Sequence, residues 1–229
     1  MLNIFARASV SRVTDPIGAW LVRMGLTPNA MTLVGTAGAV GFALWLFPTG
    51  HLVAGTLTVW GFVMLDLLDG AMARARGGGT KFGAVLDSTC DRIADGALMA
   101  AISWYAFEVA ESPSLAAAAL ICLVLGQVIS YVKARAEAAG LSADVGLVER
   151  AERLIIALAG TGLTGFGIPH AVDVALWLLV AGSVITVVQR LVAVRRSATA
   201  ETTAETGAET GAGTGEAADE PTNIPEAGE

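Results

Sequence analysis

Charged side chains are scarce in this chain of 229 residues, because Asp, Glu, Lys and Arg make up 15% of it, whereas an ordinary soluble domain carries about 25%. Hydrophobic residues account for 54%, and the mean hydropathy is +0.64. This composition argues against a soluble domain and is typical of a helical protein with several membrane spans. The chain has two cysteines, Cys90 and Cys122, both inside expected membrane helices, so a disulfide framework is not expected.

The net charge of −7 belongs to the C-terminal end of the chain. Eight of the 21 acidic residues and no basic residue follow Ser197, so the preceding part carries 14 basic against 13 acidic residues. Residues 197–229 consist largely of Ala, Glu, Thr and Gly, and their shortage of apolar side chains predicts a disordered acidic tail. Nothing in this charge distribution suggests a nucleic-acid partner.

Apolar runs separated by short turns predict an all-α integral membrane protein, with six transmembrane helices in a domain of residues 26–196. The expected spans cover about residues 29–47, 51–74, 81–105, 112–139, 148–163 and 171–195. Several are near the ~20 residues needed to cross the hydrocarbon of a bilayer. Residues 1–25 mix apolar and basic side chains, which predicts an amphipathic helix on the membrane surface.

The distribution of basic residues predicts the orientation of these spans. The turns at 48–51, 106–113 and 164–170 contain no Lys or Arg. All 14 basic residues lie in the N-terminal segment, near the other turns, at the start of the third span or toward the C-terminal end. Basic loops stay on the cytoplasmic side. We therefore expect a multi-pass protein of the plasma membrane whose turn at 75–81 faces the cytoplasm.

Four aspartates interrupt the second and third expected spans, and acids inside a membrane usually mark a functional site. Asp66 and Asp69 are three positions apart. Asp87 and Asp91 are four apart, and both spacings place a pair on one helix face. The glycine-rich residues 76–80 predict a turn that folds the two helices together. Because clustered carboxylates repel one another unless a cation is bound, these aspartates predict a site for Mg²⁺ or Mn²⁺. The alternative is that they only pair with arginines of the same hairpin.

The hairpin resembles the signature of the CDP-alcohol phosphotransferases at every fixed position. From Asp66 to Asp91 it reads D-x-x-D-G-x-x-A-R, eight further residues, then G-x-x-x-D-x-x-x-D. Members of that family transfer a phosphatidyl or similar group from a CDP-linked donor to an alcohol and release CMP. The resemblance implies six transmembrane helices after a surface helix, and usually a homodimer. It implies two metal ions per active site, with Asp91 as general base for the acceptor hydroxyl; the metal ligands would be Asp66, Asp69, Asp87 and Asp91.

The same resemblance implies a binding site for the donor, CDP-diacylglycerol, around this hairpin. The residues at the corresponding positions are Asn29, Thr32, Gly70, Arg74 and Thr80. Asn29 and Thr32 have an alternative explanation, since they also stand at the beginning of an expected helix.

Basic residues after the hairpin suggest an acceptor that carries a phosphate, since Arg and Lys are the usual phosphate ligands. Within the family, residues 25–29, 76–80, 129–137 and 152–155 resemble the actinobacterial phosphatidylinositol phosphate synthases. That resemblance implies an inositol phosphate acceptor; the residues that would hold it are Ser130, Lys133, Arg135, Arg153 and Arg190. The alternative is that these bases anchor helix ends at an anionic lipid surface.

The sequence thus predicts a transferase that converts CDP-diacylglycerol and inositol phosphate into phosphatidylinositol phosphate and CMP. Glycerol 3-phosphate, the acceptor of a phosphatidylglycerophosphate synthase, and free inositol, the acceptor of a phosphatidylinositol synthase, are the alternatives within the family. A divalent-cation transporter is the alternative from another class. Against the transporter, the acids gather near one end of their spans, and no matching polar positions continue toward the other end.

Overall fold

The computed structural model describes the backbone of residues 2–213 and the side chains of residues 12–200. Every regular element in this part of the chain is helical. The helices are α1 (Leu2–Arg23), α2 (Pro28–Leu46), α3 (Leu52–Ala75), α4 (Lys81–Glu108), α5 (Pro113–Ala138), α6 (Arg150–Gly165) and α7 (Ala171–Gly213). The six expected spans correspond to α2–α7, and their boundaries agree within a few residues except at the end of α7.

Short polar signals explain where three of these helices begin. The hydroxyls of Thr27, Thr80 and Ser112 each accept a hydrogen bond from the backbone N–H three residues later, at 3.1, 2.9 and 3.3 Å. Each bond satisfies one of the N–H groups that lack a partner in the first helical turn. Pro28 and Pro113 follow two of these caps, at the position where proline is best tolerated in a helix.

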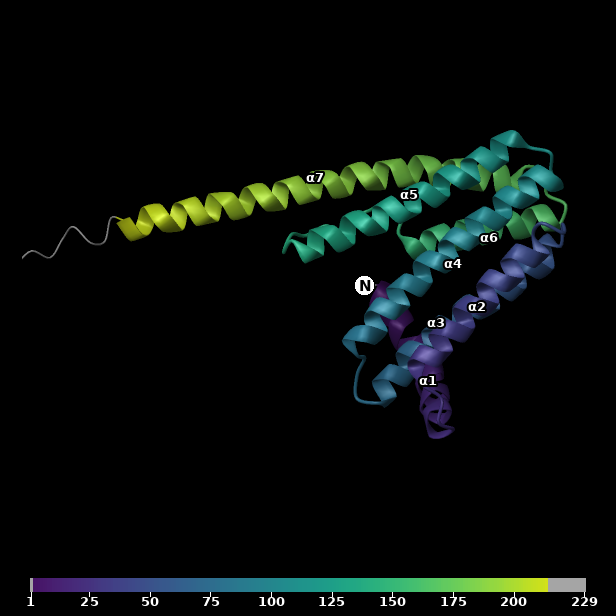
Figure 1. Ribbon diagram of the computed structural model, residues 1–229, viewed down its shortest axis with the longest axis horizontal. Helices are drawn as coiled ribbons and strands as arrows, with labels where there is room; N and C mark the ends of the chain where they lie inside the picture. Colours follow the sequence, from purple (N-terminus) through teal and green to yellow (C-terminus); the bar gives the residue numbers. More distant parts are fainter. Residues whose placement is uncertain (1, 214–229) are drawn as a thin grey trace, which may run out of the picture.

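The helices gather at one end of the molecule and spread apart at the other (Figure 1). The turns that follow α2, α4 and α6 lie together at the gathered end. There, a Cβ on Gly50 would be 3.6 Å from Cγ1 of Val109, and Gly165 packs against Leu52 and Val53. Toward the other end, α2 and α3 diverge from α5 and α7. Two helices connect these pairs: α4 contacts α2 and α5, and α6 contacts α3 and α7.

An apolar core fills the gathered half of the molecule. Its largest fully buried side chains include Phe47, Leu98, Ile102, Leu115, Leu158, Leu176 and Leu179. Alanines at 101, 116, 118, 119 and 157 are also fully buried, and such small side chains let membrane helices approach closely. The charged residues of α3–α7 are therefore concentrated toward the end where the helices spread.

Four of the described helices are long and apolar enough to cross a membrane: α2, α3, α5 and the Ala171–Ala200 part of α7. The chain is accordingly a membrane protein. From Lys81 to Asp95, α4 carries five charged residues: Lys81, Asp87, Asp91, Arg92 and Asp95. α6 has 16 residues, fewer than the ~20 that cross a bilayer upright. The number of six spans therefore remains a prediction. A surface position for α1 also remains a prediction; in the structure, α1 packs against α3.

The structure differs from the sequence prediction at the C-terminal tail. α7 continues to Gly213, so residues 197–213 are helical where disorder is predicted. Ala and Glu are good helix formers, and a segment that prolongs an existing helix needs no new nucleus. A shortage of apolar side chains prevents packing but not local helix formation, which explains the difference. The remainder of the predicted tail, 214–229, lies outside the described residues.

Candidate active site

Three of the four aspartates form a cluster where α3 faces α4. One carboxylate oxygen from each of Asp66, Asp69 and Asp87 lies within 4.8 Å of the other two. Asp69 is buried, and Asp66 and Asp87 are partly buried. Carboxylates at this separation repel one another strongly, and their oxygens are the donors that hard divalent cations prefer. The residues present therefore fit a divalent metal ion.

Asp91 lies beside this cluster. Its Oδ1 atom forms an ion pair of 2.7 Å with Nη2 of Arg150. Asp91 lines two cavities: a small one that it shares with Asp66 and Thr32, and a large pocket on the other side. This boundary position suits a group that accepts a proton from a molecule in the large pocket, while a role for Asp91 as a metal ligand stays a prediction.

Two residues predicted to contact the donor, Asn29 and Thr80, meet where α2 and α4 begin. A Cβ built on Gly83 would be 3.1 Å from Oγ1 of Thr80 and 3.2 Å from Oδ1 of Asn29. Both distances are tighter than ordinary van der Waals contacts, so glycine at 83 allows the two polar side chains to stay together. The sequence pairs these residues only through the family resemblance, and the structure brings them into one place.

Gly70 and Arg74 lie one turn apart on α3, toward its C-terminal end. Nη2 of Arg74 donates to Oδ1 of Asp15 on α1 at 2.7 Å, and both side chains are about half exposed. A Cβ on Gly70 would be 3.6 Å from Nη1 of Arg74. Arg74 therefore links α3 to α1, and its predicted contact with the donor stays a prediction.

Thr32 serves the aspartate cluster directly. Its hydroxyl donates a hydrogen bond to Oδ2 of Asp69, and the side chain is buried. The sequence offers a donor contact or a helix start as its role, and neither includes this bond, because the two residues are 37 positions apart on different helices. By fixing one carboxylate oxygen, Thr32 orients a predicted metal ligand.

A pocket of about 800 Å³ opens beside Asp91, bordered by residues of α4, α5, α6 and α7. Four of the five residues predicted to hold the acceptor line it: Ser130, Lys133, Arg153 and Arg190. Arg135 does not line it and is exposed. Lys133 and Arg135 are two positions apart on α5, and helix residues at that spacing point in different directions.

Lys133 and Arg190 are also held by protein groups. Nζ of Lys133 lies 2.6 Å from Oδ1 of Asp144, and this hydrogen bond holds the pKa of the Asp144 carboxyl below its ordinary value. Arg190 donates to the backbone carbonyls of Val145 and Ile129, at 2.9 and 2.7 Å. Arg190 thus joins α7 to α5 and to the loop at 139–149, in addition to bordering the pocket.

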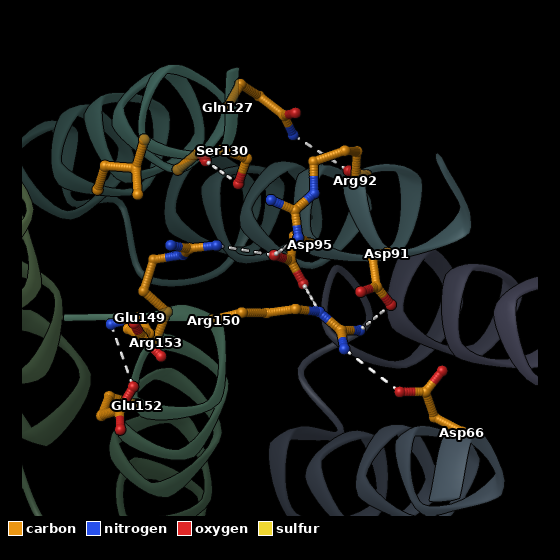
Figure 2. A network of polar contacts seen from close by, with 12 residues as sticks. Asp66, Asp91, Arg92, Asp95, Gln127, Ser130, Glu149, Arg150, Glu152 and Arg153 are labelled. Atoms are coloured by element: carbon orange, nitrogen blue, oxygen red, sulfur yellow. Dashed lines mark hydrogen bonds and ion pairs between the residues drawn. The ribbon is translucent and has the colours of Figure 1, made fainter. Parts of the chain in front are cut away.

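Arg150 contacts the aspartates of the candidate site, although the sequence prediction does not include it among the site residues. Its guanidinium reaches Oδ2 of Asp66 at 3.4 Å and Oδ1 of Asp91 at 2.7 Å, and its Nε lies 3.3 Å from Asp95 (Figure 2). As the first residue of α6, it lies opposite the aspartates of α3 and α4. A basic residue near the start of an expected span is the only sign of this in the sequence, and the same sign fits a lipid anchor.

Comparison with known proteins identifies a family and several relatives. A family model described as CDP-alcohol phosphatidyltransferase matches residues 25–189, which include every predicted site residue except Arg190. Phosphatidylinositol phosphate synthase of Mycobacteroides abscessus is 55% identical over 201 residues, which cover 87% of this chain and 91% of that protein. The protein of the same name from Corynebacterium glutamicum is 52% identical over 202 residues, covering 88% and 92%.

Solved structures give the same result. The structure of Mycobacterium tuberculosis phosphatidylinositol phosphate synthase with CDP-DAG bound matches with a TM-score of 0.77 and 55% identity, covering 80% of this chain and 94% of that one. The same protein in complex with manganese and citrate matches with a TM-score of 0.77 and 54% identity, covering 81% and 90%. The manganese complex agrees with the divalent-metal chemistry of the three-aspartate cluster.

Proposed function

The chain belongs to the CDP-alcohol phosphatidyltransferase family, and on this basis we propose that it makes phosphatidylinositol phosphate. It transfers the phosphatidyl group of CDP-diacylglycerol to a hydroxyl of an inositol phosphate and releases CMP. The observation that carries the choice of acceptor is the basic pocket beside Asp91, lined by Lys133, Arg153 and Arg190. Relatives more than 50% identical are named for the same reaction.

The proposed metal site holds two divalent ions, Mg²⁺ or Mn²⁺, through Asp66, Asp69, Asp87 and Asp91. Bound there, the ions neutralise the diphosphate of the donor and polarise the phosphoryl group under attack. The close approach of three of these carboxylates supports the proposal. Thr32 and Arg150 assist by fixing single oxygens of Asp69 and Asp91.

Asp91 takes the proton of the acceptor hydroxyl in the proposed reaction. As the hydroxyl oxygen bonds to the phosphorus of the phosphatidyl group, the phosphorus–oxygen bond to CMP breaks, and CMP leaves with that electron pair. Arg150 engages Oδ1 of Asp91 at 2.7 Å, which leaves Oδ2 as the oxygen that takes the proton. A carboxylate in hydrogen-bond reach of the hydroxyl can act in this way as the transition state forms.

The two substrates approach Asp91 from opposite sides in this proposal. The CDP portion of the donor lies along the starts of α2 and α4, near Asn29, Thr80 and the end of α3. The acceptor occupies the large pocket, with its phosphate toward Lys133 and Arg153. The large pocket beside Asp91 supports the place of the acceptor, and the approach of Asn29 and Thr80 to each other at Gly83 supports that of the donor.

The membrane arrangement is part of the same proposal. Six spans place the active site on the cytoplasmic side of the plasma membrane, where water-soluble inositol phosphate and CMP can enter and leave. α4 supports this, since its far end reaches the turn between α2 and α3, as expected of a helix that crosses the full thickness. The homodimer implied by the family resemblance completes the proposal, and the mass of the detergent-solubilised protein measured by light scattering tests it.

A membrane assay tests the reaction. Membranes containing the protein receive CDP-diacylglycerol and Mn²⁺ with inositol phosphate, free inositol or glycerol 3-phosphate, and CMP release is followed. We expect CMP with inositol phosphate, and little with inositol, which leaves the basic pocket without a phosphate. A preference for glycerol 3-phosphate would overturn the acceptor assignment, and no CMP with any acceptor would overturn the transferase. In the same assay, Asp91→Asn should lower turnover on the order of 10²- to 10⁴-fold, and near-normal turnover would exclude Asp91 as the base.

A further inference from the structure

Asp95 lies one helical turn beyond Asp91 on α4, and it is buried, with 7% of its surface exposed. Three arginines converge on its carboxylate (Figure 2). Oδ1 accepts from Nε of Arg150 at 3.3 Å. Oδ2 accepts from Nη2 of Arg153 at 2.9 Å and lies 3.5 Å from Nη2 of Arg92. Asp95 belongs neither to the proposed metal ligands nor to the proposed acceptor residues.

All three arginines line the large pocket, whereas Asp95 does not. Asp95 therefore reaches the pocket only through the guanidinium groups that it binds. Each guanidinium has five N–H donors in a planar fork, so binding to Asp95 at one edge sets the direction of the remaining donors. Nε of Arg92 is buried and has no hydrogen-bond partner in the described part of the chain. One donor of this cluster is thus not used by the protein itself.

Stability alone is a weak explanation for such a cluster. Burying ionic groups costs about as much desolvation free energy as their attraction returns, so a buried ion pair is often no better than apolar packing. The side chains of Arg92 and Arg150 are 27% and 25% exposed, and that of Arg153 is 4% exposed. Asp95 offsets part of their mutual repulsion. Arg150 also pairs with Asp66 and Asp91, whereas the ion pairs of Arg92 and Arg153 in the described part of the chain are with Asp95 alone.

Arg153 is confined from its other side as well. A Cβ on Gly126 of α5 would be 3.2 Å from Nε and 3.4 Å from Cζ of Arg153. Any larger residue at 126 would displace the guanidinium. Gln127, the next residue, donates to the carbonyl of Arg92 at 3.1 Å, which ties α5 to α4 at this level. The guanidinium of Arg153 is thus held between Asp95 and the bare backbone at Gly126.

We infer that Asp95 is a positioning residue for the acceptor phosphate. Its carboxylate fixes Arg153 toward the phosphate-binding part of the pocket and fixes Arg150 where it contacts Asp91. This inference rests on the proposed function, because the acceptor phosphate is part of it. Asp95 itself contacts neither substrate, and its effect passes through the two arginines.

The first test is Asp95→Asn, which keeps the shape of the side chain and removes its charge. Because each arginine loses a charge-assisted hydrogen bond, we expect the KM for inositol phosphate to rise about tenfold, and the KM for CDP-diacylglycerol to stay within about twofold. Asp173→Asn is the matched control. Asp173 lies in the first turn of α7, at the opposite end of the molecule, so both KM values should be unchanged. An equal rise of both KM values in the Asp95 variant would overturn the inference, as would no rise.

A binding measurement without turnover separates this inference from the proposed reaction. In metal-free detergent solution, inositol phosphate should raise the unfolding midpoint of the wild-type protein, and Asp95→Asn should require about tenfold more ligand for the same shift. Equal ligand requirements would contradict the role of Asp95. Failure of wild-type membranes to release CMP with any acceptor would instead contradict the reaction.

Two further variants distinguish positioning from a general loss of structure. Gly126→Ala presses on Arg153 from the other side and should also raise the KM for inositol phosphate selectively. In the background of Arg153→Ala, Asp95→Asn should add little to the KM for inositol phosphate, because the arginine that Asp95 directs toward the phosphate is gone. Fully additive effects would show that Asp95 does not act through Arg153. If Asp95→Asn fails to fold, an unchanged acceptor KM in Gly126→Ala overturns the inference.

Discussion

Thr32 illustrates how a single hydroxyl can orient a predicted metal ligand on another helix. Its bond to Asp69 occupies one carboxylate oxygen and holds the side chain in a buried position between α2 and α3. Groups that orient metal ligands in this way typically change metal affinity by about 10–100-fold when removed. The contribution of Thr32 should therefore be visible in the metal requirement of the reaction.

Thr32→Val, which preserves the shape of the side chain, should raise the Mn²⁺ concentration for half-maximal CMP release about tenfold. At saturating Mn²⁺, the KM for inositol phosphate should be unchanged, because Thr32 does not line the acceptor pocket. Thr58→Val is the control, since Thr58 lies two turns before Asp66 on α3. A metal requirement equal to that of the wild-type protein would show that the Thr32–Asp69 bond does not support the site.

The candidate site could be predicted from the sequence only where its residues are close in the chain. Asp66, Asp69 and Asp87 were predictable because helical spacing and one turn at 76–80 are enough to bring them together. Arg150 was not, since it reaches Asp66 across 84 positions of sequence and depends on where α6 begins relative to α3. Asp95 has the helical spacing of the aspartates predicted to bind metal, and only its arginine partners distinguish it from them.

At the level of elements, the first turn of α6 determines where the arginines of the site lie. Arg150 and Arg153 are three positions apart and project from the same face. The backbone N–H of Glu149 donates to Oε2 of Glu152 at 3.1 Å, which closes the beginning of the helix. A hydrogen bond of this kind, from the backbone before the helix to a side chain in its first turn, fixes where the helix starts and the direction in which the chain enters it.

Glu152→Ala removes this acceptor and should lower the free energy of unfolding by about 1 kcal/mol, the typical effect of losing a helix cap. The unfolding midpoint in detergent measures the loss. Glu152→Gln keeps an oxygen that accepts the same hydrogen bond and should unfold close to the wild-type midpoint. If both variants are destabilised equally, the charge of Glu152 rather than its hydrogen bond supports the helix.

Helix boundaries were predictable for a related reason. The caps at Thr27, Thr80 and Ser112 act over three residues and can be recognised without knowledge of the fold. The end of α7 was not, because it depends on continuation of an existing helix rather than on a stop signal. Glycines occur between 207 and 215, well after the end that hydropathy indicates.

At the level of the whole molecule, the number of spans decides which side of the membrane each turn occupies. With six spans, the turn near Ala110 lies on the outer side, together with the turn near Ile168. If α4 and α6 did not cross, the turn near Ala110 would lie on the same side as the glycine-rich turn at 76–80. The contact between Gly50 and Val109 favours six spans, because it joins the end of α4 to the turn between α2 and α3.

Single cysteines can distinguish these arrangements in a chain whose Cys90 and Cys122, 5% and 1% exposed, are replaced by alanine. A membrane-impermeant maleimide is applied to right-side-out vesicles before and after permeabilisation. Ile168→Cys should react at once and Gly79→Cys only after permeabilisation, and both results are the same for four or six spans. Ala110→Cys decides between them. With six spans, α4 carries the chain across the membrane, so Ala110→Cys should react at once. Reaction only after permeabilisation would mean that both ends of α4 lie on the same side, and the prediction of six spans would be wrong.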